Sequence, residues 1–149
     1  MRDRIRAAWR SRSDPLGFRD IRRWIAGVAE RSGVAAGEAH ALSVAANEMC
    51  ANVHRHAYGG SRDGPLDLTI DVGPDRIVVT VGHEGAPFDP ERYVPPDLSR
   101  PAERGYGMFL VSRLVDTIRF VRKAKGTSVV LMKRRTSARA EAPAGQGER

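Results

Sequence analysis

The chain has 149 residues and a formal net charge of +7, from 25 Lys and Arg residues against 18 Asp and Glu residues. Apolar residues make up 41% and charged residues 29% of the sequence, which is typical of one globular domain with a buried core. The single cysteine excludes a disulfide framework and fits a reducing compartment, and no uncharged run approaches the roughly 20 residues that span a bilayer. We therefore predict a cytoplasmic protein without a membrane span.

The positive charge lies at the two ends of the chain. Residues 1–13 carry a net charge of +4 and residues 133–149 carry +3, so the stretch between them is neutral. Nonspecific nucleic-acid binding rests on clustered positive charge, and a neutral body argues against direct binding to nucleic acid. We expect a basic arm or an edge strand at residues 1–13 and a disordered basic tail at residues 134–149. Acidic protein surfaces are the better candidate partners for both ends.

Two helices are predicted in the first part of the chain. Asp14 and Pro15 are typical of a helix start, and Gly33 is typical of its end. Between them, apolar residues recur at helical spacing: Ile21, Trp24, Ile25 and Val28. A second helix is predicted over residues 36–56, with an apolar stripe at Leu42, Ala45, Met49 and Val53.

The second part of the chain predicts two strand pairs around a long loop and a short helix. Residues 66–72 alternate between apolar and polar, and residues 77–81 are β-branched, which indicates a hairpin. Residues 84–104 hold five of the nine prolines, and a loop of this length is usually functional or disordered. A helix over residues 108–115 and strands over residues 117–122 and 127–133 complete the pattern.

This order of elements predicts an α+β fold. We expect a two-layer sandwich that spans residues 14–133, with a mixed, mostly antiparallel sheet and helices on one of its faces.

Glu48 and Asn52 are the first candidates for chemistry. They are four residues apart on the predicted helix, so they share one face. An amide oxygen is a suitable ligand for Mg²⁺, and a carboxylate one turn away can take a proton from an attacking hydroxyl. Taken alone, the pair is better explained as two solvated surface residues.

Two glycine motifs are the next candidates. Gly85 follows a predicted strand, where a glycine lets a flat ligand approach the backbone. Gly105 and Gly107 open a helix whose free amides can bind phosphate, and Arg104 can add a charged contact. Each motif alone also fits an ordinary turn or helix start.

The ordered set of motifs resembles the GHKL ATPase superfamily, to which histidine-kinase catalytic domains and gyrase belong. The closer resemblance is to the bacterial anti-sigma factor serine/threonine kinases. It is carried by residues 46–59, 83–90 and 104–110, which are similar to that family's N-box and its two glycine boxes, and by Gly126 and Thr127 in the last hairpin. The resemblance extends over roughly residues 16–133, nearly the whole body of the chain.

The resemblance implies a fold, a reaction and a site. Asn52 would coordinate Mg²⁺, Glu48 would be the general base, and residues 84–104 would form a lid over ATP. Nucleotide contacts would come from a larger set of residues: Asn52, His56, His83, Gly85, Arg104, Gly105, Tyr106, Gly107, Met108 and Thr127. The protein would phosphorylate a serine or threonine of a STAS-domain anti-sigma factor antagonist, sequester a sigma factor and form a homodimer.

One position departs from the family's pattern. His83 stands two residues before Gly85, where the family usually has an aspartate that accepts a hydrogen bond from adenine. A neutral histidine accepts through only one nitrogen, and a protonated one accepts through neither. The alternative hypothesis is therefore a partner-switching module of the same fold with weak or lost ATP binding.

Two further alternatives have less support in the sequence. Cys50 and His54 share a helix face, but a zinc site needs three or four converging ligands. A histidine kinase would need a helix pair carrying a phospho-acceptor before this domain.

His56 follows Asn52 by four residues, and we expect it to support the asparagine by hydrogen bonding.

Overall fold

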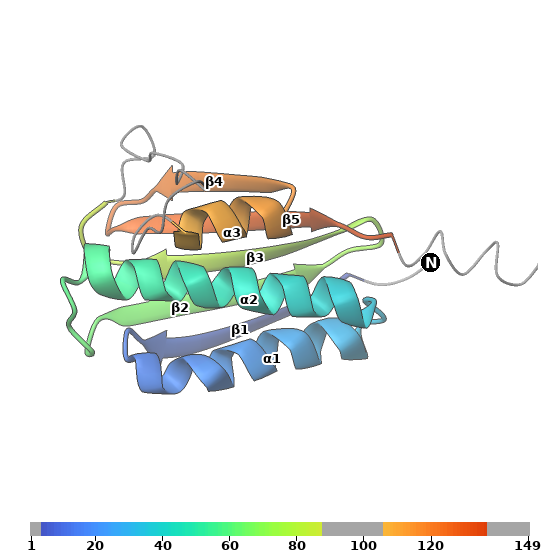
Figure 1. Ribbon diagram of the computed structural model, residues 1–149, viewed down its shortest axis with the longest axis horizontal. Coiled ribbons are helices and arrows are strands. Elements are labelled where there is room, and N and C mark those ends of the chain that lie inside the picture. The colour runs from blue at the N-terminus through green and yellow to red at the C-terminus, as the bar shows by residue number, and fades with distance from the viewer. Residues whose placement is uncertain (1–3, 88–105, 137–149) are drawn as a thin grey trace, which may run out of the picture.

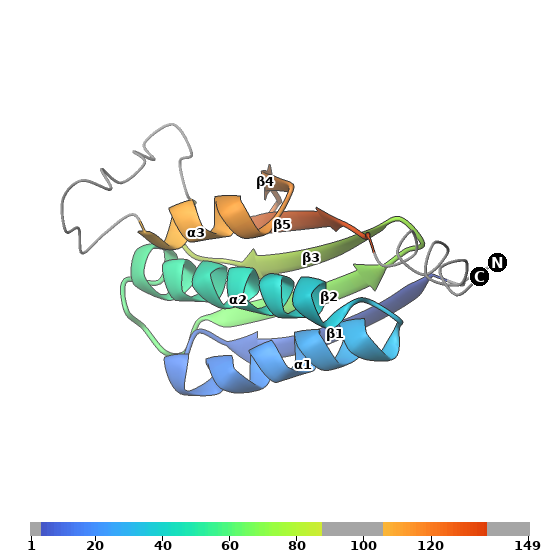
Figure 2. The same cartoon turned by 45° about the vertical axis from the view of Figure 1, so that its right-hand side comes forward.

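The protein is a two-layer sandwich of one sheet and three α-helices, in a computed structural model that describes residues 4–87 and 106–136. The helices all cover the same face of the sheet (Figures 1 and 2). The strands are β1 (Ile5–Arg12), β2 (Pro65–Val72), β3 (Arg76–His83), β4 (Thr117–Arg122) and β5 (Thr127–Arg134). The α-helices are α1 (Phe18–Arg31), α2 (Ala36–Asn52) and α3 (Tyr106–Leu114). The predicted α+β sandwich is confirmed.

The sheet has the strand order β1-β2-β3-β5-β4, and each of its four pairings is antiparallel. The sheet is thus more regular than the mixed one that the sequence predicted. Alternate residues of β2 and β3 are buried against the helices, as the pattern of Leu66, Leu68, Ile70 and Val72 predicts. These side chains and the apolar faces of α1 and α2 form one core.

The basic N-terminal segment is an edge strand. β1 pairs with β2 along its whole length, and its arginines lie on the face of the sheet away from the helices. Arg10 forms an exposed ion pair with Asp67 at 2.9 Å, and Arg4 pairs with Asp71. On the other face, Trp9 meets Trp24 of α1 edge to face, with ring centroids 5.5 Å apart.

The first two helices differ in detail from the prediction. Asp14 accepts a hydrogen bond from the Leu16 amide and caps a short 3₁₀ turn, after which α1 begins at Phe18. The predicted helix over residues 36–56 is α-helical only as far as Asn52 and continues as one π-helical turn, η2 (Val53–Ala57). Single π-helical turns inside helices are frequent at functional sites.

The C-terminal boundary of the domain differs from the one expected at residue 134. Arg135 is buried, and its guanidinium donates to the carbonyls of Gly73 and Gly33 at 2.8 and 2.9 Å. The next residue, Thr136, donates from its amide and hydroxyl to Glu38 at the start of α2. These contacts hold residues 135 and 136 on the domain body, because the β2–β3 turn and the α1–α2 turn bring their carbonyls together there. The remainder of the predicted tail lies outside the described residues.

Candidate functional site

One end of the sandwich gathers most of the predicted site residues. The C-terminal end of α2, the N-terminal end of α3, the end of β3 and the start of β5 all lie at this end (Figure 1). α2 contributes Glu48, which is half-buried, and Asn52, which is only 8% exposed. Both point toward α3, because they lie one turn apart on the flank of α2 that packs against that helix.

Gly107 brings the glycine motif against this pair. A methyl group on its Cα would lie 3.0 Å from Glu48 Oε2 and 3.6 Å from Asn52 Oδ1. The absence of a side chain therefore lets the first turn of α3 approach the carboxylate and the amide closely. Residues 48 and 52 were predicted from one pattern and residue 107 from another, and the fold brings all three to one place.

The remaining glycine-motif residues are only partly described. Tyr106 begins α3, and Met108 is half-buried against the core. Arg104 and Gly105 lie outside the described residues, as does most of the predicted lid.

Arg55 is a polar neighbour of Asn52 that the sequence analysis did not single out. Its guanidinium donates a 2.9 Å hydrogen bond from Nη2 to Asn52 Oδ1, across the junction between α2 and the π-helical turn. His56, which we expected to support Asn52, is exposed, and Arg55 is the described side chain that donates to this amide. The three-residue spacing of a polar pair on a helix is the signal that could have indicated Arg55.

The site fits a magnesium ion held together with phosphate. Asn52 supplies an oxygen ligand, and Mg²⁺ commonly takes one or two protein oxygens and completes its shell with water and phosphate. Within residues 4–87 and 106–136, no three His, Cys, Asp or Glu side chains cluster closely enough to hold a metal by themselves. Asn52 is the residue of this site that would hold the ion together with phosphate.

His83 and Thr127 form a polar pair at the end of the sheet. They are direct partners in the β3–β5 register, and each is only 5% exposed. The Nδ1 atom of His83 and the Oγ1 atom of Thr127 are buried without a hydrogen-bond partner. Burial lowers the pKa of His83, so its imidazole is neutral near pH 7. Buried polar atoms without a partner are rare in a folded protein, so this residue pair is a candidate for contact with a ligand.

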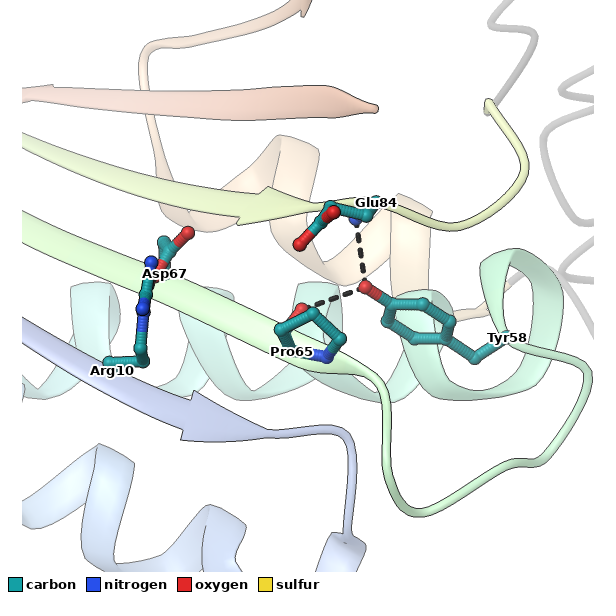
Figure 3. A network of polar contacts seen from close by, with 5 residues as sticks. All are labelled: Arg10, Tyr58, Pro65, Asp67 and Glu84. Atoms are coloured by element: carbon teal, nitrogen blue, oxygen red, sulfur yellow. Dashed lines mark hydrogen bonds and ion pairs between the residues drawn. The ribbon is translucent and has the colours of Figure 1, made fainter. Parts of the chain in front are cut away.

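Tyr58 fixes the backbone beside this pair. Its hydroxyl donates to the Pro65 carbonyl at 2.7 Å and accepts from the Glu84 amide at 2.8 Å, so it joins the start of β2 to the end of β3 (Figure 3). The Tyr58 ring also meets the His83 ring edge to face, with centroids 6.1 Å apart. Burial raises the pKa of Tyr58, which keeps the hydroxyl protonated as a donor.

Gly85 lies against the same tyrosine. A side chain at residue 85 would collide with the Ala57 carbonyl and would lie 2.9 Å from the Tyr58 ring, and the next amide, of Ala86, donates to Ala57. The glycine predicted from the sequence is thus required by close packing against the π-helical turn.

Cys50 and His54 have structural positions. Cys50 is fully buried, and burial raises the pKa of its thiol to about 12, which makes it unreactive. His54 Nδ1 lies 2.7 Å from the Ser13 carbonyl oxygen and 3.2 Å from that of Ser61. Since both partners are acceptors, this nitrogen carries a hydrogen and joins η2 to the end of β1.

Comparison with known proteins places this architecture in a family. The family model described as "Histidine kinase-like ATPase domain" matches residues 12–133. The chain therefore belongs to the histidine kinase-like ATPase domain family.

Curated relatives narrow the class. The serine-protein kinase RsbW of Bacillus subtilis (strain 168) is 32% identical over 121 residues, which cover 76% of this chain and 75% of that protein. The serine-protein kinase RsbW of Bacillus cereus (strain AH187) is 31% identical, with 76% and 74% covered. The chain therefore belongs to the anti-sigma factor serine/threonine kinase family, as its motifs predicted.

Solved structures agree with the fold. The structure of the RsbU and RsbW domains of Rv1364c from Mycobacterium tuberculosis superposes with a TM-score of 0.64 at 15% identity, covering 88% of this chain and 32% of that longer chain. The histidine kinase domain of the blue-light activated histidine kinase from Erythrobacter litoralis gives a TM-score of 0.55 at 18% identity, covering 85% of this chain and 63% of that chain. None of the helices described here is both long and apolar enough to cross a membrane.

Proposed function

We propose that this protein is an ATP- and Mg²⁺-dependent serine/threonine protein kinase. Its substrate is a serine or threonine hydroxyl of a STAS-domain anti-sigma factor antagonist. The observation that carries this proposal is the meeting of Gly107 with Glu48 and Asn52, which sets a candidate base and a metal ligand beside the free amides of a helix start. The family relationship to serine-protein kinases supports the same reaction.

Each residue at this end of the sandwich has a role that suits its chemistry. Glu48 accepts the proton of the attacking hydroxyl, whose oxygen forms a bond to the γ-phosphorus of ATP while the bond from that phosphorus to the bridging oxygen of ADP breaks. Asn52 holds the metal, which when bound neutralises charge on the phosphate oxygens. Gly107 keeps the first turn of α3 close to both residues, and Gly105 and Arg104 extend the phosphate site.

We assign the nucleoside part of ATP to the edge of the sheet where β3 ends and β5 begins. His83 and Thr127 have buried polar atoms without partners, and Gly85 follows directly on the same segment. Tyr106, Met108 and His56 complete the predicted nucleotide contacts. We propose that residues 84–104 close over this region as a lid.

The partners follow from the same family relationship. We propose that the protein sequesters a sigma factor in the cytoplasm, that it does so as a homodimer, and that phosphorylation of the antagonist controls this sequestration. The arginines of β1 and the basic C-terminal segment are candidates for contacts with acidic surfaces of these partners, because the protein body between them is neutral.

Incubation with γ-labelled ATP and the STAS protein encoded in the neighbouring operon tests the proposal. The wild-type protein transfers label to a serine or threonine of that partner, and Asn52→Ala abolishes the transfer. The matched control is Asn47→Ala, which removes an amide from the same helix and leaves transfer within twofold. Labelling that survives Asn52→Ala unchanged would refute the assignment of the metal ligand.

A second candidate function is favoured by His83 alone. If this residue prevents ATP binding, the protein is a partner-switching module without kinase activity. Calorimetric titration of ATP into the wild type and into His83→Asp separates the two candidates. Equal and tight binding by both proteins supports the kinase, whereas binding only by His83→Asp supports the module.

A further inference from the structure

Two unpartnered polar atoms stand out at the nucleotide end of the molecule. In the described part of the chain, four buried side-chain atoms lack a hydrogen-bond partner: Glu38 Oε1, His83 Nδ1, Thr127 Oγ1 and Arg135 Nε. The atoms of Glu38 and Arg135 lie at the opposite end of the sheet, where both side chains make other hydrogen bonds. His83 and Thr127 face each other across β3 and β5, so they offer one shared polar edge.

This polar edge suits a nucleobase better than a phosphate. His83 lies on the same strand face as the buried Val79 and Val81, so it points into the layer between sheet and helices. Its imidazole is neutral, and its neighbour Thr127 is uncharged, so the pair offers directional hydrogen bonds without net charge. The charged and metal-binding groups of the site lie instead on α2 and at the start of α3.

The chemistry of the two side chains differs from that of a carboxylate. An ionised carboxylate only accepts hydrogen bonds, so it favours an amino group on the base and repels a carbonyl group. A neutral imidazole has one donor nitrogen and one acceptor nitrogen, and its tautomer adjusts to the partner. A threonine hydroxyl also donates or accepts by rotation. This pair can therefore satisfy either group on a purine.

We propose that His83 and Thr127 set the nucleotide specificity of the site, and that they admit 6-oxo purine nucleotides as well as adenine nucleotides. The inference rests on the proposed function, since it takes the β3–β5 end as the nucleoside end of the site. Histidine in place of the family's usual aspartate at residue 83 would then broaden nucleotide specificity and would not abolish ATP binding.

Calorimetric titration with ATP and with inosine triphosphate tests this specificity, because these nucleotides differ at the purine 6-position and the adjoining ring nitrogen. With Mg²⁺ present, the wild type is expected to bind both with Kd values within threefold of each other. His83→Asp is expected to prefer ATP by more than 30-fold. His83→Asn, whose amide also donates and accepts, is expected to keep the relaxed selectivity.

The titration results distinguish a failure of this specificity inference from a failure of the kinase proposal. A wild type that prefers ATP by 30-fold or more overturns the inference while the kinase proposal stands. A wild type that binds neither nucleotide overturns both. Because the wild-type ratio decides the question, the test does not depend on whether His83→Asp folds.

Discussion

The Arg55 guanidinium holds the Asn52 side-chain oxygen through a 2.9 Å hydrogen bond, at the junction of α2 and the π-helical turn. A positively charged group thus contacts the atom that is proposed to bind the metal. A divalent cation at Asn52 therefore has to share or replace this donor. Arg55 is exposed, so its side chain has room to move away.

Substitution of Arg55 by alanine is expected to ease metal binding at Asn52. Without the competing donor, the Mg²⁺ concentration that half-saturates nucleotide binding falls by about threefold, which corresponds to part of one charged hydrogen bond. Titration of Mg²⁺ at fixed ATP, followed by calorimetry, measures this concentration. Arg62→Ala removes an equal charge from the nearby loop and is the control. A rise in the half-saturating concentration for Arg55→Ala would show that Arg55 assists the site instead.

Tyr58 is expected to contribute to stability through its hydroxyl. Tyr58→Phe removes both the donor to Pro65 and the acceptor for Glu84 while keeping the ring against His83. The free energy of unfolding is expected to fall by about 1–2 kcal/mol, because two backbone groups lose their partner. Urea denaturation measures the change. A loss below about 0.3 kcal/mol would mean that water replaces the hydroxyl at no cost.

Buried His83 is expected to make the protein less stable in mild acid. Its folded pKa is lowered from the ordinary value of 6.5 by burial, so below pH 6.5 the unfolded chain binds a proton that the folded protein does not. The stability that comes from keeping His83 neutral is therefore fully present above pH 6.5. It is lost as the pH falls from there through the folded pKa of His83.

Denaturation curves between pH 7.5 and pH 5 test this pH dependence. His83→Gln is expected to flatten the decline, whereas His40→Gln, at an exposed position of α2, is expected to leave it unchanged. Equal declines for the wild type and His83→Gln would assign the effect to other groups.

Much of the fold could be predicted from local patterns. The alternation of Leu66, Leu68, Ile70 and Val72 indicated a half-buried strand because successive side chains of a strand point to opposite faces. Glu48 and Asn52 were found by their four-residue spacing, which a helix converts directly into proximity. The resemblance implied a nucleotide contact for Gly107 but not its close approach to this pair, which depends on the packing of α3 on α2.

The features that were missed depend on contacts between distant segments. Tyr58 gains its importance only when β2 and β3 bring Pro65 and Glu84 to its hydroxyl. Arg135 looked like part of a polar tail, but two turns that are far apart in sequence surround it with carbonyl groups. No local pattern encodes such an environment, because composition alone favours disorder for this segment.

Glu48 provides the most direct test of the proposed reaction. Glu48→Gln keeps the shape of the side chain but removes its ability to accept a proton. We therefore expect single-turnover transfer of the γ-phosphate of ATP to the STAS partner to slow by about 10²- to 10⁴-fold, with the Kd for ATP within about threefold of the wild type. An unchanged transfer rate in Glu48→Gln at saturating ATP would contradict the account.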